Sequence, residues 1–356
     1  MIYLDHHAAS PLDARVARAM TDAPFGNPES AHGVGRRARK AVEEARAAVA
    51  RSVGVTPNEV VFTSGGTEAC NLGVLGLPGA RVWTSALEHP AVRAAVDARG
   101  GQVGFLDVAP GHAPTVDEVA GRVREGDLVV VQHASHETGA VADVDAMADV
   151  VHAAGARLFV DAVASYGRLE VALRADAWAL ASHKVGGPPG AGALIVRRGL
   201  PLEPQVRGGG QERGRRGGTP DVRALVGFGV AASLVEERRA GMPAVAARRD
   251  ALERALLELG GEVSARGNRT ASVTHVAFPR WRGAELVAAL DLEGLACSAG
   301  AACSSGVTTG SPAMRAWYPH ESWRVQGTLR LSLGPETTDD EVTAAIEILR
   351  RVIPRA

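Results

Sequence analysis

The sequence predicts an α/β protein with a mainly parallel seven-stranded sheet, helices on both faces of that sheet, and a second, smaller α+β unit. Short apolar runs recur along the first two thirds of the chain, and several are continuously apolar, as in strands buried on both faces. Ala-rich segments with helical spacing separate these runs. After Arg239 the alternation stops, which indicates a change of architecture.

Seven apolar runs are expected to form the strands of the sheet. The helical segments between them include 37–52, 90–99 and 145–154. In sheets of this class, ligands bind beyond the carboxyl ends of the strands, so polar residues at those ends are candidate site residues. The expected strands are 60–63, 81–84, 103–106, 128–131, 157–160, 178–181 and 192–196.

The C-terminal part is predicted to form the smaller unit. We place a large domain at 12–242 and a small domain at 1–11 and 243–356. The small domain is expected to contain helices at 243–260 and 283–291, strands at 271–278 and 328–333, a Gly/Ser/Thr-rich loop at 298–311, and a last helix that starts at the capping box Thr338-Asp339-Asp340-Glu341.

Composition excludes several classes of protein. The 356 residues are 46 % hydrophobic with a formal net charge of −1, which argues against a broad polyanion-binding role. No uncharged apolar stretch reaches about 18 residues, so no membrane span is expected. The N-terminal residues lack the pattern of a signal peptide, and three cysteines are too few for a disulfide framework. We expect a cytoplasmic protein without a metal site.

Lys184 is the most informative residue. It follows the expected strand 178–181 and precedes the glycine turn Gly186-Gly187, and the chain has only one other lysine, Lys40. Most loop lysines are simply solvated. A lysine held between a buried strand and a turn is instead desolvated, which favours the neutral amine that can form a Schiff base with an aldehyde cofactor. The sequence therefore predicts an amine nucleophile here.

Three further candidates also follow expected strands. The segment 63–68 combines a strand end, a glycine turn and a helix start, which is a ready anion site, although plain capped helices look similar. Asp161 is either a helix cap or a carboxylate that pairs with a protonated ring nitrogen. His89 either begins a helix without a further role, or it stacks on a planar cofactor or shuttles protons as a catalytic residue.

Cys303, Arg330 and the glycine-rich cluster 207–219 complete the candidates. Small residues surround Cys303, which suits a thiol that must move, whereas Cys70 and Cys297 fit buried packing residues. Arg330 lies in an apolar run and needs an anionic partner, for which a substrate carboxylate is one candidate. The cluster 207–219 is compatible with a linker or with a loop at a site.

An ordered set of motifs resembles the cysteine desulfurases, which are class V aminotransferase-like transferases of fold-type I that use pyridoxal phosphate. The similarity runs nearly end to end, and the order of the motifs makes it specific. The matching segments are 3–10, 26–32, 62–68, 88–90, 161–162, 183–184, 208–213 and 218–219.

The resemblance implies a role for each candidate. Lys184 would carry pyridoxal phosphate, Asp161 would pair with its ring nitrogen, and His89 would stack on the ring. Cys303 would be the nucleophilic cysteine, and Asn27 and Arg330 would bind the substrate carboxylate. The remaining implied cofactor-binding residues are Gly66, Thr67, Ser182, His183 and His136, with Thr219 supplied by the other subunit of a homodimer.

The implied reaction converts L-cysteine to L-alanine and leaves a persulfide on Cys303. Nine positions separate Cys303 from Pro312, which resembles the long-loop branch of the family, so transfer of the sulfur to an acceptor protein is expected. The acceptor and its pathway stay open.

Three positions depart from the family pattern. His136 replaces an Asn and Ala164 replaces a Gln, and both of the usual residues contact the phenolic oxygen of the cofactor. Ala181 replaces a phosphate-binding Ser, with Ser182 one place later. Two alternatives therefore stay open. One is another pyridoxal-phosphate reaction, such as a selenocysteine lyase, a C–S lyase or an aminotransferase, and the other is a non-catalytic homologue that acts as a partner protein.

We predict that Lys184 is the lysine that binds the cofactor. Borohydride reduction followed by peptide mapping should place the cofactor on the Lys184 peptide, and Lys184→Ala should abolish turnover because no other amine occupies a strand end. Lys40→Ala serves as the matched control and should retain turnover. A label on Lys40, or turnover retained in Lys184→Ala, would contradict the prediction.

Overall fold

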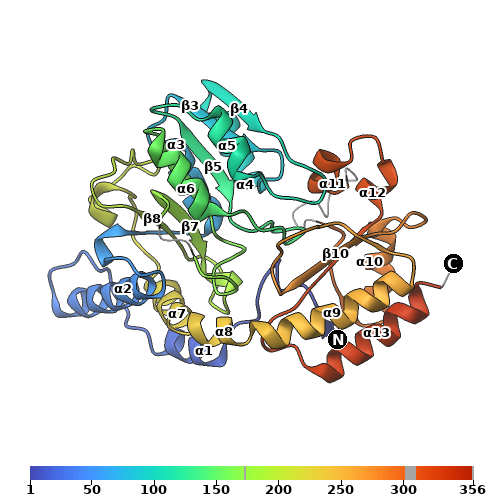
Figure 1. Cartoon of the computed structure of the whole chain (residues 1–356). Helices are drawn as coiled ribbons and strands as arrows, with labels where there is room; N and C mark the ends of the chain where they lie inside the picture. The colour runs from blue at the N-terminus through green and yellow to red at the C-terminus, as the bar shows by residue number, and fades with distance from the viewer. Residues whose placement is uncertain (172–173, 301–309, 355–356) are drawn as a thin grey trace.

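The computed structural model describes residues 1–171, 174–300 and 310–354, and its centre is a seven-stranded sheet (Figure 1). All seven strands lie at the expected places, within one residue at each end. Their bounds are β2 (Val60–Thr63), β3 (Arg81–Ser85), β4 (Gln102–Leu106), β5 (Leu128–Gln132), β6 (Arg157–Asp161), β7 (Ala177–Ala181) and β8 (Gly192–Val196).

The strand order is β2-β8-β7-β6-β5-β3-β4. The pairs β3–β4, β3–β5, β5–β6 and β6–β7 are parallel, whereas β8 pairs antiparallel with both β7 and β2. The sheet is therefore mainly parallel, as predicted. Because β5, β6 and β7 run in the same direction, the residues that follow them lie at one edge of the sheet.

Helices cover both faces because alternate side chains of each strand point in opposite directions. Leu128 and Val130 of β5 pack in a hydrophobic cluster with α3 (Gly66–Gly76) and α4 (Pro90–Arg99). Val129 and Val131 pack in a second cluster on the other face. The helices that contribute to this second cluster are α1 (Ala14–Thr21), α2 (Gly33–Ser52), α5 (Val116–Arg122), α6 (Val144–Ala153), α7 (Val222–Ser233) and, through Val235, α8 (Val235–Ala240).

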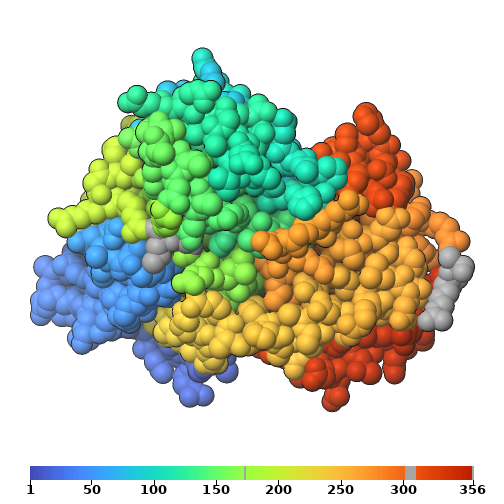
Figure 2. Space-filling model, viewed as in Figure 1, coloured from blue at the N-terminus to red at the C-terminus, as the bar shows by residue number. Residues whose placement is uncertain are grey.

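The C-terminal part has its own sheet, in which β10 (Val273–Ala277) lies between β9 (Glu262–Val263) and β12 (Thr328–Ser332), both antiparallel to it. Leu4 packs with residues 242–353 in a separate hydrophobic cluster. In Figures 1 and 2 this part, in orange and red, lies along one side of the molecule. The other helices are α9 (Met242–Glu258), α10 (Gly283–Leu292), α11 (Pro312–Trp317), α12 (Ser322–Gln326) and α13 (Asp339–Val352).

The capping box is confirmed, since Thr338 and Glu341 make both of its reciprocal hydrogen bonds at the start of α13. The strand expected at 271–278 is shorter in the structure, where it spans Val273–Ala277. The division of the chain near residue 242 stays a prediction.

The N-terminal strand β1 (Ile2–Tyr3) pairs in parallel with β11 (Leu295–Ala296), so the chain begins within the C-terminal sheet region. Asp5 forms a bridge with Ser332, and the chain then runs to the large sheet, where the Ser10 backbone N–H donates to the His183 carbonyl over 2.8 Å. These first ten residues therefore connect the two sheets.

The glycine-rich cluster 207–219 is anchored to the large sheet. Glu212 forms a buried ion pair with Arg46, with a distance of 2.6 Å, and accepts a hydrogen bond of 2.9 Å from the backbone of Phe62. Glu212 and Arg213 have φ angles of 48° and 58°, a left-handed conformation that costs free energy for side chains with a Cβ. The buried ion pair compensates for that conformation, so this segment is a fixed loop and not a free linker. The turn at its centre is η3 (Gln211–Gly214).

Candidate active site

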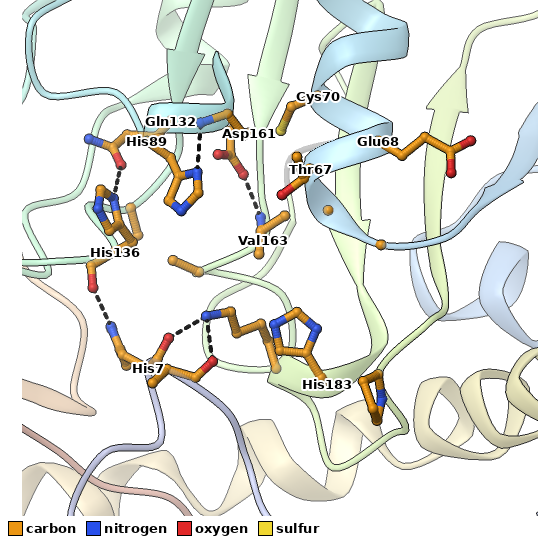
Figure 3. A pocket seen from close by; sticks show the side chains of 18 of the residues that line it. His7, Thr67, Glu68, Cys70, His89, Gln132, His136, Asp161, Val163 and His183 are labelled. Carbon is orange, nitrogen blue, oxygen red and sulfur yellow. Dashed lines mark hydrogen bonds between the residues drawn. The ribbon is translucent and has the colours of Figure 1, made fainter. Parts of the chain in front are cut away.

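A cavity of about 370 Å³ opens at the carboxyl ends of β5, β6 and β7 (Figure 3). The residues that line it come from seven separate parts of the chain, including the N-terminal segment and β12. Eight of the predicted site residues are among them, namely Gly66, Thr67, His89, His136, Asp161, His183, Lys184 and Arg330.

Lys184 ends a short turn, η2 (Ser182–Lys184), that directly follows β7. Its Nζ donates hydrogen bonds to the backbone carbonyls of His7 and Ala8, the latter over 2.9 Å. Ser10 Oγ donates to the Lys184 carbonyl over 2.8 Å. The N-terminal segment thus holds both the backbone and the amine of Lys184 at the cavity.

Asp161 is the last residue of β6 and is 6 % exposed. Its Oδ1 accepts a hydrogen bond of 3.0 Å from the backbone N–H of Val163. Burial, together with repulsion from the Asp161 carboxylate, raises the pKa of the Cys70 thiol well above its usual value. Cys70, which also lines the cavity, is therefore a neutral thiol.

The first turn of α3 provides an anion site at the cavity. Gly65 precedes the helix, and no side chain caps its first backbone N–H groups. A Cβ on Gly66 would lie 2.8 Å from Val163, so only glycine allows this close approach. Unsatisfied N–H groups at a helix N-terminus attract a phosphate.

His89 combines both roles that the sequence left open. Its Nδ1 accepts a hydrogen bond of 3.0 Å from the Ala91 backbone N–H and thereby caps α4, while the ring lines the cavity. The rings of His89 and His136 meet edge to face with centroids 4.8 Å apart. Burial lowers the pKa of His89 and, to about 4, the pKa of His183.

Arg330 is 1 % exposed and has an anionic partner within the chain. Asp5 accepts a hydrogen bond of 2.6 Å from its Nη2, and the His136 carbonyl accepts one of 3.0 Å from its Nη1. Among the residues that the structure describes, the buried Nε has no partner. The guanidinium is therefore fixed in orientation and keeps one N–H available at the cavity.

Three predicted residues lie outside the lining of this cavity. Asn27 is exposed, and its Oδ1 accepts a hydrogen bond of 3.0 Å from the Glu29 backbone. Thr219 is exposed and lines a neighbouring cavity of about 180 Å³. Ser182 is fully buried, and its Oγ has no partner within the described part of the chain. Cys303 lies outside the described residues, and the roles of these four residues stay predictions.

Sequence reasoning missed two residues that line the cavity, His7 and Gln132. Gln132 ends the apolar run of β5, so a polar side chain at the carboxyl end of a buried strand was an available signal. No local signal pointed to His7, which reaches the site only because β1 pairs with β11.

Comparisons with known proteins agree with this geometry. The family model for class-V aminotransferases matches residues 2–344. The chain belongs to that family. Within it, the chain is 35 % identical to the IscS-like cysteine desulfurase of Mycobacterium tuberculosis, over all of this chain and 97 % of that protein. It is a member of the cysteine desulfurase branch of the class-V aminotransferases, as its motifs predicted.

Solved structures show the same fold. A NifS-like protein superposes with a TM-score of 0.91 at 28 % identity, covering 99 % of this chain and 98 % of that one. A structure described as SspA in complex with cysteine has a TM-score of 0.82 at 28 % identity and covers 95 % of this chain and all of that one. The fold is therefore that of the fold-type I pyridoxal-phosphate enzymes.

The residues of the cavity fit pyridoxal phosphate. The cavity brings together one group for each part of the cofactor. Lys184 offers an amine for the aldehyde, Asp161 a buried carboxylate for the ring nitrogen, and the uncapped start of α3 a site for the phosphate. Nε2 of His136, which lines the cavity, is a further polar atom that lacks a protein partner among the described residues. Such unpaired buried groups are costly unless a bound molecule satisfies them.

A second buried carboxyl group lies behind the cavity. Glu88 is 1 % exposed, and its Oε1 accepts a hydrogen bond of 2.6 Å from Ser85 Oγ, while its Oε2 has no partner among the described residues. Burial, reinforced by repulsion from Asp161, raises the pKa of Glu88 to about 8. Glu88 is therefore protonated at neutral pH, and Asp161 is not next to a second negative charge.

We predict that Glu88 makes the protein less stable as pH rises from about 5 to 8. In the unfolded protein the Glu88 carboxyl has a pKa near 4.5 and is ionised throughout this window. In the folded protein its pKa is about 8, so it keeps its proton over most of the window. Its contribution to the free energy of unfolding should fall by at most about 1.4 kcal/mol per pH unit. Glu88→Gln should remove this slope in denaturant titrations, with the exposed Glu44→Gln as control. An unchanged slope in Glu88→Gln would show that the carboxyl is already ionised.

Proposed function

We propose that this protein is a pyridoxal-phosphate-dependent cysteine desulfurase, which converts L-cysteine to L-alanine and passes the sulfur to Cys303 as a persulfide. The observation that carries the proposal is the meeting of Lys184, Asp161, the α3 start and Arg330 at one cavity. The desulfurase names of its relatives, and the cysteine bound in one structural neighbour, support L-cysteine as the substrate.

Lys184, His89, Asp161 and the first turn of α3 would hold the cofactor and orient it. When bound, pyridoxal phosphate supplies an electron sink that acidifies the Cα–H bond of the amino acid. Lys184 Nζ, held by the His7 and Ala8 carbonyls, is placed to take up and return that proton. Arg330 would bind the substrate carboxylate through its unpaired Nε–H, while Asp5 keeps the guanidinium in place.

In the overall change, the carbon–sulfur bond of L-cysteine breaks and a sulfur–sulfur bond forms on the Cys303 thiolate. The three-carbon fragment keeps its amino group and gains a proton at the former sulfur-bearing carbon, which gives alanine. The persulfide then passes to an acceptor protein, whose identity follows from neither the cavity nor the motifs.

The properties of the other two cysteines support Cys303 as the nucleophile. Burial raises the pKa of Cys297 to about 12, and the pKa of Cys70 lies well above its usual value. A nucleophilic cysteine must ionise, so neither described thiol is suited to attack sulfur at neutral pH. Cys303, surrounded by small polar residues in the sequence, is the remaining cysteine.

We predict that Cys303→Ser retains the cofactor but loses alanine release from L-cysteine by at least about 10²-fold, since removal of a nucleophile removes the acceptor for sulfur. Alanine and sulfide are measured after incubation with L-cysteine and a thiol, and mass spectrometry locates the persulfide. Cys297→Ser is the matched control and should remain active.

Other outcomes of the same assay would favour other functions. Pyruvate and ammonia in place of alanine would indicate a lyase, as would undiminished alanine release by Cys303→Ser. Turnover of selenocysteine alone would indicate a selenocysteine lyase. Absence of turnover in a cofactor-bearing protein would favour a partner protein, in line with the substitutions at His136, Ala164 and Ala181.

We also propose that the active form is a homodimer in which Thr219 completes the phosphate site of the other subunit. Thr219 is exposed and does not line the cavity of its own chain. The neighbouring cavity that it does line shares Ser64 and Gly190 with the main cavity, so a second chain seated there would be next to the α3 start.

We predict that sedimentation will give a dimer at all concentrations that support activity. Thr219→Ala should weaken cofactor affinity by about tenfold, because it removes one hydrogen bond to the phosphate that contributes about 1.4 kcal/mol. The variant should remain a dimer. An active, cofactor-bearing monomer would contradict the proposal. None of the helices in the described part of the chain has the length and hydropathy of a membrane span.

A further inference from the structure

Gln132 is held in one orientation beneath the cavity. It is 5 % exposed, and its Nε2 donates a hydrogen bond of 2.6 Å to the backbone carbonyl of Leu87. A carbonyl oxygen only accepts, so this bond determines which end of the amide is the nitrogen. The amide oxygen Oε1 therefore points the other way, toward His136 (Figure 3).

The orientation of Gln132 determines where His136 carries its proton. His136 Nδ1 lies 3.3 Å from Gln132 Oε1. Because an amide oxygen cannot donate, Nδ1 must carry the hydrogen. Burial, with repulsion from His89 and Arg330, lowers the pKa of His136 well below its usual value, so the ring is neutral. A neutral ring with Nδ1 protonated has a lone pair on Nε2.

This lone pair has no partner in the part of the chain that the structure describes. His136 lines the cavity, and its Nε2 is buried without a hydrogen bond among the described residues. An unmade hydrogen bond of this kind costs about 1–3 kcal/mol. The Arg330 Nη1 bond to the His136 carbonyl places this histidine beside the candidate carboxylate-binding guanidinium. A lone pair repels a carboxylate, so the group that satisfies Nε2 must be a proton donor.

We propose that Gln132 is a positioning residue that fixes His136 as a proton acceptor, and that His136 Nε2 takes a proton from the bound amino-acid substrate. This inference rests on the proposed function for its substrate, L-cysteine, which carries two such donors, the α-ammonium and the thiol. Each must lose its proton before it reacts. The proton moves to Nε2 only transiently, because burial and repulsion from His89 and Arg330 disfavour the imidazolium. The Nδ1–H bond to Gln132 Oε1 offsets part of that cost, and Nε2 then gives the proton up again.

The proposal revises the expected role of His136. A hydrogen-bond donor to the phenolic oxygen of the cofactor, as inferred from the family pattern, would need the proton on Nε2. That tautomer would leave Nδ1 and Gln132 Oε1 facing each other as two acceptors, unless the amide turned and lost its bond to Leu87. The hydrogen bonds in the structure therefore favour an acceptor over a donor.

The tautomer is tested by ¹⁵N NMR of cofactor-free protein labelled in its histidines, with His136→Asn to identify the signals. Nδ1 of His136 should be protonated and Nε2 unprotonated. Gln132→Met, which has similar length but no acceptor, should give a mixture of tautomers. The matched control is His133→Asn, because His133 is buried on the same segment but does not line the cavity. A protonated Nε2 in the wild-type protein would overturn the proposal, whatever the outcome of the desulfurase assay.

Proton transfer from the substrate is tested on cofactor-loaded protein. L-alanine supplies an ammonium without a thiol, and 3-mercaptopropionate supplies a thiol without an ammonium. The Nε2 signal should shift as expected for a nitrogen that accepts a hydrogen bond with one of them, which identifies the donor. A signal unchanged by both would overturn the proposal. So would a signal that moves fully on cofactor binding alone, since the donor would then be the ring hydroxyl.

Kinetics give a readout that a purely structural role would not change. Gln132→Met should lower kcat/KM for L-cysteine by about tenfold and alter the acidic limb of its pH profile, because the fraction of His136 with a free Nε2 falls. Thermal unfolding checks that Gln132→Met and His133→Asn are equally folded. A reduced kcat/KM with an unchanged pH profile would count against proton transfer to His136.

Discussion

The ion pair between Asp5 and Arg330 is the contact on which the site depends most. The two residues are 325 positions apart in the chain and meet at 2.6 Å, with Arg330 almost fully buried. Removal of one member of such a pair leaves an uncompensated buried charge, which costs about 3–5 kcal/mol. The pair fixes the N-terminal segment against β12, and the next few residues then carry the carbonyls that hold Lys184.

The N-terminal segment thus has a function as well as a place in the two-stranded pairing of β1 with β11. It begins as β1 beside β11, crosses the boundary between the two sheets at Asp5, and ends in contact with the turn that carries Lys184. Any relative movement of the two sheets would change the distance between Lys184 and Arg330. Lys184 would bind the cofactor, and Arg330 would bind the carboxylate of the substrate. Their separation is therefore set by one short stretch of chain.

Burial determines the charges in the cavity more than sequence composition does. His7, His89, His136 and His183 line it, and burial lowers the pKa of all four, so each is a neutral hydrogen-bonding group at physiological pH. Behind them Glu88 is protonated for the same reason. The fixed charges near the bound molecule are consequently few, and the placement of single protons, as on His136, decides which groups can donate and which can accept.

Much of the fold and the central part of the site followed from the sequence alone. Apolar runs located all seven strands because burial on both faces imposes a local pattern, and strand ends located Lys184, Asp161 and the start of α3 because parallel strands share one edge. The partner of Arg330, the contribution of His7 and the Gln132–His136 pair were decided only by the tertiary structure. The local pattern of apolar residues indicates whether a segment is buried. The hydrogen-bond partner of a buried polar group depends instead on which distant segments of the chain pack against it.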